Sequence, residues 1–352
     1  MTGRERILLA LSRRQADRIP KLELCFWAET VERWRQEGLP AGVEPADYFG
    51  LDGITIFSYD GSLGLPEKTL SETGTERVFT DSNGVTYKEL KGQTNTECPQ
   101  DYLIKSQDDW EEHRSLLTPT LDRLKPEEQA KYDAAKAKDE FTVLSPIDPC
   151  WYALRLMGEE EFLMNTVLEP EYTERVISDY LDFNLAMLEQ MISSGYQMDA
   201  VWFFSDLCYK NGMLFSPDFY RKRLMPYHKR MFDCCHANNL KVIYHCDGKV
   251  DRLLPLLVES GIDCIQPMEA RAGNDVREYK KLYGDRIAFM GNISADVMGT
   301  TRDAIETEMR DKILTAKQGG GYVYHSDHSI PPSVSFENYC AVMEMVDKYG
   351  KY

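Results

Sequence analysis

The chain has 352 residues, of which 43% are hydrophobic, and its formal net charge is −17 at pH 7. This acidic excess argues against a nucleic-acid partner, because phosphates would be repelled. No uncharged apolar run approaches the roughly 18 residues of a membrane-spanning helix, so no membrane partner is expected. The first residues, Met1 to Arg6, lack the apolar stretch of a signal peptide, which predicts a cytoplasmic protein.

The nine cysteines are scattered and contain no Cys-x-x-Cys pair. An odd number without regular spacing does not indicate a disulfide framework. We expect a reduced protein in which most thiols are buried.

Short β-branched and aromatic runs alternate with amphipathic stretches along most of the chain. A first helix, capped by Thr2, is predicted over 4–13. The eight predicted strands cover 21–26, 53–57, 141–145, 200–204, 240–244, 263–266, 287–290 and 322–324. Most are followed by a predicted helix, one of them beginning at Ser216-Pro217. This rhythm predicts an α/β fold, a (β/α)8 TIM barrel. A doubly wound sheet is the alternative, but no glycine fingerprint follows the first strand.

Residues 62–140 interrupt this rhythm after the second strand. Two β-rich runs flank Asn83-Gly84, a pair that suits the positive φ angles of a hairpin turn. Polar helices are predicted around 106–116 and 126–138. We predict an inserted hairpin and helices on one domain that spans residues 1–352.

The carboxyl ends of barrel strands meet at one mouth, where active sites lie. The polar side chains predicted there are Glu23, Tyr59, Asp60, Asp148, Asp206, His245, Asp247, Glu269, Asn292, His325, Asp327 and His328. Imidazole and carboxylate groups from different strands predict a divalent ion, with zinc as the leading candidate.

Several of these residues also have a structural interpretation. A lone His245 is more often a hydrogen-bonded core residue, and Asp148 is expected to cap the helix near Trp151. Strand alternation turns Cys246 away from the side shared by His245 and Asp247, so we predict a packed thiol. His113, His228 and His236 lie in predicted helices and are expected to be structural.

Over nearly its whole length the chain resembles the uroporphyrinogen decarboxylase superfamily, whose fold is a (β/α)8 barrel. The segments that carry the resemblance are Ala16-Asp17-Arg18-Ile19-Pro20, Leu214-Phe215-Ser216-Pro217, Gly261-Ile262-Asp263, Gln266-Pro267-Met268-Glu269, Met290-Gly291-Asn292-Ile293, Gly319-Gly320-Gly321-Tyr322 and Ile330-Pro331-Pro332. True decarboxylases hold their polyanionic tetrapyrrole with an arginine-bearing segment at the first strand. Residues 23–29 contain no arginine, which counts against that branch.

Another branch comprises zinc methyltransferases that work with a corrinoid protein. Its motif is His-x-Cys-Gly at the fifth strand, with a second cysteine shortly before an Ile-Pro-Pro-like segment. Here Asp247 and His328 take the places of the two cysteines. The resemblance therefore implies metal ligation by His245, Asp247 and His328, with Glu269 as a further candidate. A homodimer is also an expectation that comes from the family.

Exchanging thiolates for harder ligands makes a metal better at polarising oxygen. We therefore predict transfer of a methyl group from an O-methyl substrate, such as a methoxylated aromatic, to the cobalt of a corrinoid protein. Asp206 or Tyr59 would protonate the departing oxygen. The predicted substrate-binding residues are Glu23, Phe26, Trp27, Asp148, Phe204, Tyr209, Asn292 and His325. The chain has no Asp-x-His-x-x-Gly corrinoid motif, so a partner protein must bring the corrinoid.

Two alternatives stay open. One is a decarboxylase acting on a porphyrinogen or a smaller acid. The other is a non-catalytic barrel that binds a small molecule.

Overall fold

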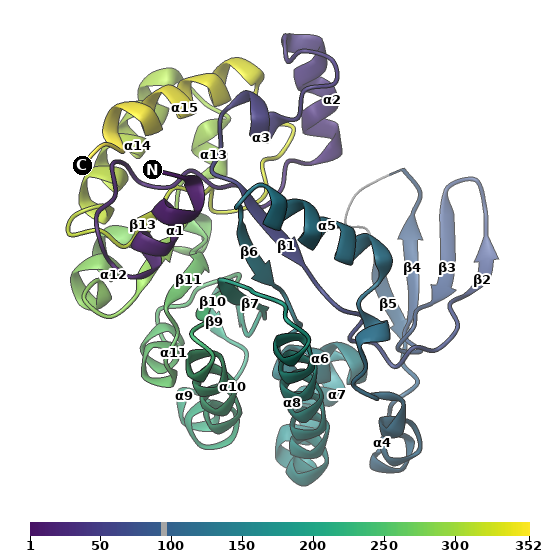
Figure 1. Cartoon of the computed structure of the whole chain (residues 1–352). Helices are drawn as coiled ribbons and strands as arrows, with labels where there is room; N and C mark the ends of the chain where they lie inside the picture. The colour runs from purple at the N-terminus through teal and green to yellow at the C-terminus, as the bar shows by residue number, and fades with distance from the viewer. Residues whose placement is uncertain (93–96) are drawn as a thin grey trace.

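The computed structural model describes residues 1–92 and 97–352, and a curled parallel sheet of seven strands forms its centre (Figure 1). The strands are β1 (Ile54–Phe57), β6 (Phe141–Leu144), β7 (Ala200–Phe204), β10 (Lys241–Cys246), β11 (Cys264–Pro267), β12 (Ala288–Met290) and β13 (Tyr322–Val323), paired in that order. All six pairings are parallel. The predicted α/β barrel architecture is confirmed.

Helices surround this sheet, as Figure 1 shows. They are α1 (Gly3–Leu11), α2 (Ala28–Glu37), α3 (Pro45–Tyr48), α4 (Gln107–His113), α5 (Pro126–Ala137), α6 (Pro149–Met157), α7 (Glu159–Leu168), α8 (Pro170–Ser193), α9 (Pro217–Phe219), α10 (Met225–Ala237), α11 (Leu254–Ser260), α12 (Val276–Tyr283), α13 (Ala295–Met298), α14 (Arg302–Ala316) and α15 (Phe336–Tyr349). The helix predicted from Ser216 is interrupted, because a π-helical turn, Tyr220–Leu224, separates α9 from α10. No helix within the described ranges combines the length and apolar character needed to cross a membrane.

The strand predicted over 21–26 is not regular, and this part of the prediction was wrong. Lys21 makes a single parallel bridge to Tyr324, just beyond the end of β13. The backbone N–H of Leu24 then donates to the imidazole of His325 (2.9 Å) instead of to a strand neighbour. A side chain thus takes the hydrogen bond that would extend the ladder, and an irregular segment fills the eighth position of the barrel.

A buried carboxylate anchors this irregular segment. The Asp52 side chain, only 3% exposed, accepts from Arg6 (2.9 Å), from Arg18 (2.7 and 3.0 Å) and from the backbone N–H of Lys21 (2.8 Å). The backbone N–H of Asp52 donates back to the Lys21 carbonyl (2.8 Å). Asp52 therefore joins the irregular segment to the approach to β1.

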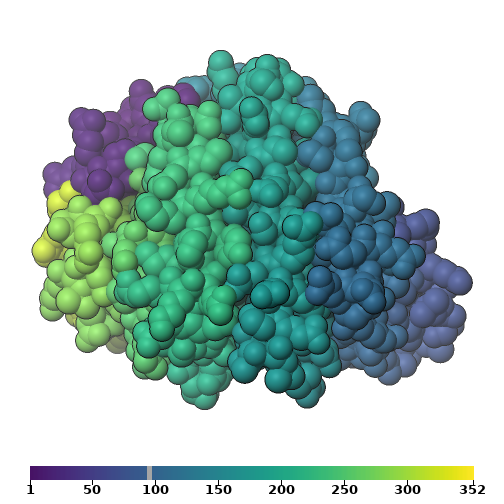
Figure 2. All heavy atoms as spheres, turned by 90° about the horizontal axis from the view of Figure 1, so that it is seen from below, coloured from purple at the N-terminus to yellow at the C-terminus, as the bar shows by residue number. Residues whose placement is uncertain are grey.

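The insertion contains more β-structure than predicted. The predicted hairpin is confirmed, since β3 (Glu76–Thr80) and β4 (Thr86–Leu90) pair across a turn in which Gly84 has a φ of +76°. Two further strands, β2 (Lys68–Glu72) and β5 (Cys98–Asp101), complete a four-stranded antiparallel sheet. Both are exposed along their whole length, so no apolar alternation reveals them in the sequence. Figure 2 shows the early part of the chain that contains this sheet at the edge of the molecule. Residues 93–96 of the predicted insertion lie outside the described residues.

The barrel has two apolar cores, one inside the sheet and one between the sheet and the surrounding helices. The inner core contains Ile243 and Trp202, and α1 contributes Ile7 and Leu11 to it. The larger outer core lies between strands and helices and includes Tyr244. Because neighbours on a strand face opposite sides, this division decides which residues of β10 can reach the mouth.

Candidate functional site

The site begins with three adjacent strands, β7, β10 and β11. His245 lies on β10, in register with Phe204 of β7 and Gln266 of β11. The loops after these strands carry Asp206, Asp247 and Glu269. Parallel strands in register bring their carboxyl ends to one edge, which places Asp206 and Asp247 beside the His245 imidazole and Glu269 next to Asp247.

Two overlapping groups of ligand atoms form at this edge. The first is Asp206, His245 and Asp247, and the second is Asp247, Glu269 and His328. Within each group the nitrogen and oxygen atoms all lie within 4.8 Å of one another. Asp247 belongs to both groups and links the ends of β7, β10 and β11 to the loop after β13.

The imidazole of His245 is held in one orientation. Its Nδ1–H donates to Oε1 of Gln266 at 2.5 Å, and its ring stacks on Phe204 with centroids 4.5 Å apart. Nε2 therefore faces Oδ1 of Asp206 at 3.4 Å and Oδ1 of Asp247 at 3.7 Å. Burial opposes protonation of His245, but Asp206, Asp247 and Gln266 outweigh it and raise the pKa of the imidazole. Histidines that bind metals usually donate their other ring N–H to a nearby acceptor, as His245 does to Gln266.

Asp247 and Asp206 differ in their electrostatics. Burial, reinforced by the charges of Asp206 and Glu269, raises the pKa of Asp247 to about 6. Its Oδ1 is buried and has no hydrogen-bond partner in the described part of the chain. Burial opposes ionisation of Asp206 too, but His245 and the backbone N–H of Asp247 (3.0 Å) leave the pKa of that carboxyl lowered. Asp247 is thus the carboxylate that most lacks a compensating positive charge.

Glu269 is 6% exposed and has defined partners. Its Oε2 accepts from the backbone N–H of Gly248 at 2.6 Å, and its Oε1 accepts from the guanidinium of Arg271 at 2.7 and 3.0 Å. Across the mouth, the indole of Trp27 meets the ring of His328 edge-on, with centroids 6.3 Å apart. These contacts orient the outer ligand candidates.

Tyr59 lies apart from these groups. Its side chain is in the outer core and donates to Asn184 of α8 at 2.8 Å. Burial raises the pKa of its hydroxyl well above the ordinary value. Of the two predicted proton donors, Tyr59 therefore lies away from His245, whereas Asp206 lies beside it.

Three more residues predicted to contact substrate instead bond to or pack against other residues of the protein. Both carboxylate oxygens of Glu23 accept hydrogen bonds, from Tyr324 (2.8 Å) and Tyr339 (3.1 Å) at one and from Ser326 (2.6 Å) at the other. His325 accepts the Leu24 N–H at Nε2, and its Nδ1–H donates to the Ser326 carbonyl. The third is Phe26, which packs edge-on against Trp34 and Tyr339 in the outer core.

The remaining predicted contacts divide between the mouth and the loops around it. Phe204 and Trp27 face the histidines of the site, as described above. The amide of Asn292 joins three backbone groups, accepting from Val276 (3.0 Å) and donating to Met268 (2.7 Å) and Asn274 (2.9 Å). Tyr209 is 49% exposed, in the small hairpin of β8 (Cys208–Tyr209) and β9 (Gly212–Met213).

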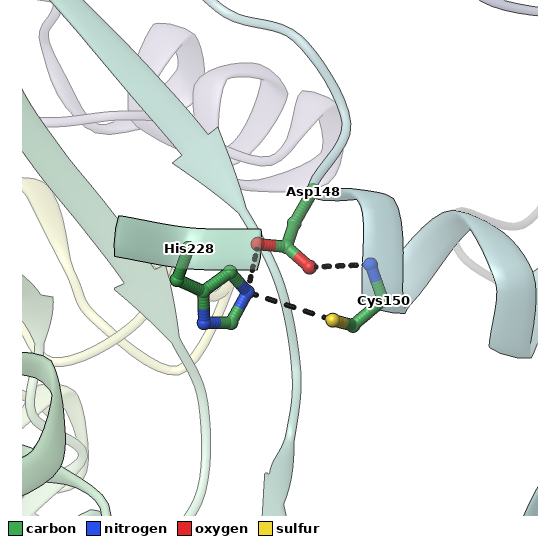
Figure 3. Close-up of side chains that lie close together, drawn as sticks. All are labelled: Asp148, Cys150 and His228. Atoms are coloured by element: carbon green, nitrogen blue, oxygen red, sulfur yellow. Dashed lines mark hydrogen bonds and ion pairs between the residues drawn. The ribbon is translucent and has the colours of Figure 1, made fainter. Parts of the chain in front are cut away.

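Asp148 caps α6, as its structural interpretation predicts. Its Oδ1 accepts from the backbone N–H groups of Cys150 (2.8 Å) and Trp151 (3.2 Å). Its Oδ2 lies 2.7 Å from Nε2 of His228 on α10, and Cys150 lies beside both (Figure 3). This third group of potential ligands is fully buried and lies in the outer core.

Sequence reasoning missed two partners of the site. Gln266 was noted only as part of a motif. Its position near the end of β11, a strand that follows β10 in the chain, was the signal that could have placed it beside His245. Arg271 was not singled out, because its proximity to Glu269 depends on a turn, Ala270–Ala272, that carries no strong sequence signal.

Gly248 permits the close approach of two loops at the site. Its φ is +80°, and an added Cβ would lie 2.7 Å from the Tyr209 carbonyl oxygen. Gly273 has a similar φ of +85°, but an added Cβ there meets nothing within 4 Å. We expect Gly273→Ala to lower the free energy of unfolding by roughly 1–2 kcal/mol, because alanine is strained in the left-handed conformation. Gly248→Ala should lower the free energy of unfolding by about 1–3 kcal/mol more, because the added methyl group overpacks the contact with Tyr209. Urea unfolding of both variants measures the difference, and equal losses would contradict the close contact.

The chain was compared with known proteins. The model of the family described as "Uroporphyrinogen decarboxylase (URO-D)" matches residues 136–349. A uroporphyrinogen decarboxylase of Coxiella burnetii is 30% identical over 76 residues, which are 22% of this chain and 21% of that protein. The methylcobamide:CoM methyltransferase MtaA of Methanosarcina barkeri is 25% identical over 203 residues, 57% of this chain and 56% of that protein.

These curated matches span about a fifth and just over half of the relatives' lengths. A solved methyltransferase structure from Methanosarcina mazei superposes with a TM-score of 0.69 at 17% identity, over 99% of both chains. At that identity the superposition shows a shared fold. Because the family match covers more than half of its residues, the chain belongs to the uroporphyrinogen decarboxylase (URO-D) family.

Proposed function

We propose that this protein is a metal-dependent methyltransferase that passes the methyl group of an O-methyl substrate to the cobalt of a corrinoid protein. The observation that carries the proposal is the convergence of two histidines and three carboxylates at the barrel mouth. They form two groups of potential ligands, and Asp247 belongs to both. A cytoplasmic location and a homodimer are part of the same proposal.

The donor set fits a divalent ion. The unpartnered Oδ1 of Asp247 is a buried acceptor that a cation would satisfy. Three carboxylates beside one another repel unless a positive charge lies between them. The residues that would hold the ion are His245, Asp247, His328 and Glu269. When bound, zinc or a similar ion supplies Lewis-acid polarisation of a substrate oxygen.

The chain's own residues bind and orient the substrate in this proposal. Phe204, stacked on His245, and Trp27, edge-on to His328, offer apolar surfaces on two sides of the site. Such surfaces suit the ring of a methoxylated aromatic. Asp206 has a lowered pKa and is ionised at neutral pH, so its role is to hold the His245 imidazole by charge. Asp247, as a ligand, would be deprotonated when the ion is bound, so the departing oxygen would take its proton from water.

The partner is inferred from the relatives. The name of MtaA says that it acts on methylcobamide and CoM. We carry over the cobamide but propose the opposite direction: in MtaA the name makes methylcobamide the methyl donor to CoM, whereas here the cobamide would accept the methyl group of an O-methyl substrate. The mouth contains nitrogen and oxygen ligands, because Cys246 faces the outer core. Without a thiolate the site is less suited to activating a thiol substrate such as CoM.

A spectroscopic assay tests the proposal. The purified protein is mixed with a reduced corrinoid protein and a panel of methoxylated aromatics, and formation of methylcobalamin is followed by its absorption change. We expect the change with the wild-type protein and its loss in His245→Ala. Absence of methylcobalamin across the panel would contradict the proposal.

One observation favours a second candidate, decarboxylation, because the C. burnetii relative carries that name at 30% identity. The mouth argues against a polyanionic substrate, since three carboxylates line it and Arg271 is already paired with Glu269. Release of CO₂ from uroporphyrinogen would reverse this ranking.

A further inference from the structure

A second set of ligand atoms lies behind β10, away from the mouth. Figure 3 shows Asp148 and Cys150 at the start of α6 and His228 of α10 pointing toward one another. All three are fully buried, and their ligand atoms lie within 4.8 Å of each other. Strand alternation separates this cluster from the candidate active site: Tyr244 faces the cluster, whereas His245 faces the mouth.

Two side chains approach the same imidazole nitrogen in this cluster. Nε2 of His228 lies 2.7 Å from Oδ2 of Asp148 and 3.6 Å from Sγ of Cys150. A ring nitrogen carries at most one proton, so its short hydrogen bond goes to the Asp148 carboxylate, and the Cys150 thiol lies beside it at the longer distance. Nδ1 is already engaged with the hydroxyl of Tyr220 at 2.6 Å, which fixes the ring with Nε2 directed at the carboxylate and the thiol.

The surroundings add a charge argument. Among the residues that the structure describes, His228 is the only ion-pair partner of Asp148. The ring of His228 is enclosed by Phe232, stacked at 5.7 Å, and Tyr244, edge-on at 5.6 Å. A divalent ion with one carboxylate, one thiolate and one neutral imidazole is electrically neutral, which suits so apolar a site.

The distances are close to those of a tetrahedral site. Zinc bonds of about 2.3 Å to sulfur and 2.0–2.1 Å to nitrogen or oxygen separate neighbouring ligands by roughly 3.3–3.6 Å. The Sγ–Nε2 distance of 3.6 Å already meets this requirement. The hydroxyl of Tyr244 donates to Oδ2 of Asp148 at 3.4 Å and adds a polar group to the cluster. The Asp148–His228 contact of 2.7 Å has to lengthen, by about 0.6–0.7 Å on the same bond lengths.

We propose that Asp148, Cys150 and His228 form a structural site for a zinc-class divalent ion, separate from the ion at the mouth. The ion would join the start of α6 to α10 in the outer core. Carboxylate, thiolate and imidazole together select a borderline-soft ion such as zinc over magnesium or calcium. Because the ligands come from distant parts of the chain, ion binding adds directly to the stability of the fold.

Cobalt substitution tests this site, because the ligands proposed at the mouth contain no sulfur. The full chain is stripped of metal, loaded with Co²⁺, and examined for the near-ultraviolet sulfur-to-cobalt charge-transfer band. We expect the band in the wild-type protein, its loss in Cys150→Ser, and its retention in Cys235→Ser. Cys235 lies on the same helix as His228, is equally buried, and serves as the matched control.

Zinc content gives a second measurement. We expect two ions per wild-type chain and one in Cys150→Ser. Asp247→Asn should keep the charge-transfer band, so a failure at the mouth is distinguishable from a failure here. No band in the wild-type protein, or a band that survives in folded Cys150→Ser, would overturn the inner site.

Discussion

Asp247→Asn is expected to abolish metal binding at the mouth while making the metal-free protein more stable. The substitution keeps the shape of the side chain but removes the charge shared by both ligand groups. Loss of an outer partner of a metal ligand costs about 10- to 100-fold in affinity, and loss of a central ligand should exceed that. Methyl transfer should fall with the affinity.

The gain in stability has a separate cause. The charges of Asp206 and Glu269 act against the ionised Asp247 carboxylate in the metal-free protein. A neutral amide relieves this repulsion, so the melting temperature without metal should rise. Zinc titration by calorimetry and thermal melts measure the two effects. Asp251→Asn, an exposed position on the same loop, should change neither. Full zinc affinity in Asp247→Asn would contradict the ligand assignment.

Asp52→Ala is expected to lower the free energy of unfolding by about 3–5 kcal/mol, the cost of breaking a buried ion pair from one side. The substitution leaves Arg18 without its carboxylate and the Lys21 N–H without its side-chain acceptor. Arg6 keeps Asp17 as a partner. Since this contact anchors the irregular eighth segment of the barrel, its loss should lower the stability of the whole fold.

Denaturant unfolding measures this loss. Asp47→Ala, at an exposed position in α3 close by in the sequence, is the control and should change stability by less than about 0.5 kcal/mol. A loss in Asp52→Ala as small as that of the control would show that the anchor does not stabilise barrel closure.

Most of the barrel was predictable because its strands are short apolar runs that end in polar residues. The first strand was not. The run from Lys21 to Phe26 has strand-like composition, but Leu24 N–H donates to His325, a residue 301 positions away. The outer strands of the inserted sheet were missed for a different reason, since both are exposed and carry no alternation.

The candidate site shows the same division. The four predicted ligands share two overlapping groups with Asp206, so the prediction and the geometry agree on where the ionisable side chains gather. Tyr59 follows β1 as Asp206 follows β7, yet its ring turns into the outer core. The side to which a residue beyond a strand end turns depends on loop conformation, which strand periodicity does not describe.

The sequence by itself determined the barrel rhythm and the alternation that places His245 toward the mouth and Cys246 away from it. These properties are local, because side-chain direction repeats every two residues along a strand. Only the tertiary structure decided that Asp247 joins Glu269 and His328, and that His228 meets Asp148 and Cys150 behind the same strand. Those meetings depend on how loops and helix faces pack across long chain separations, and that packing has no period to be read in the sequence.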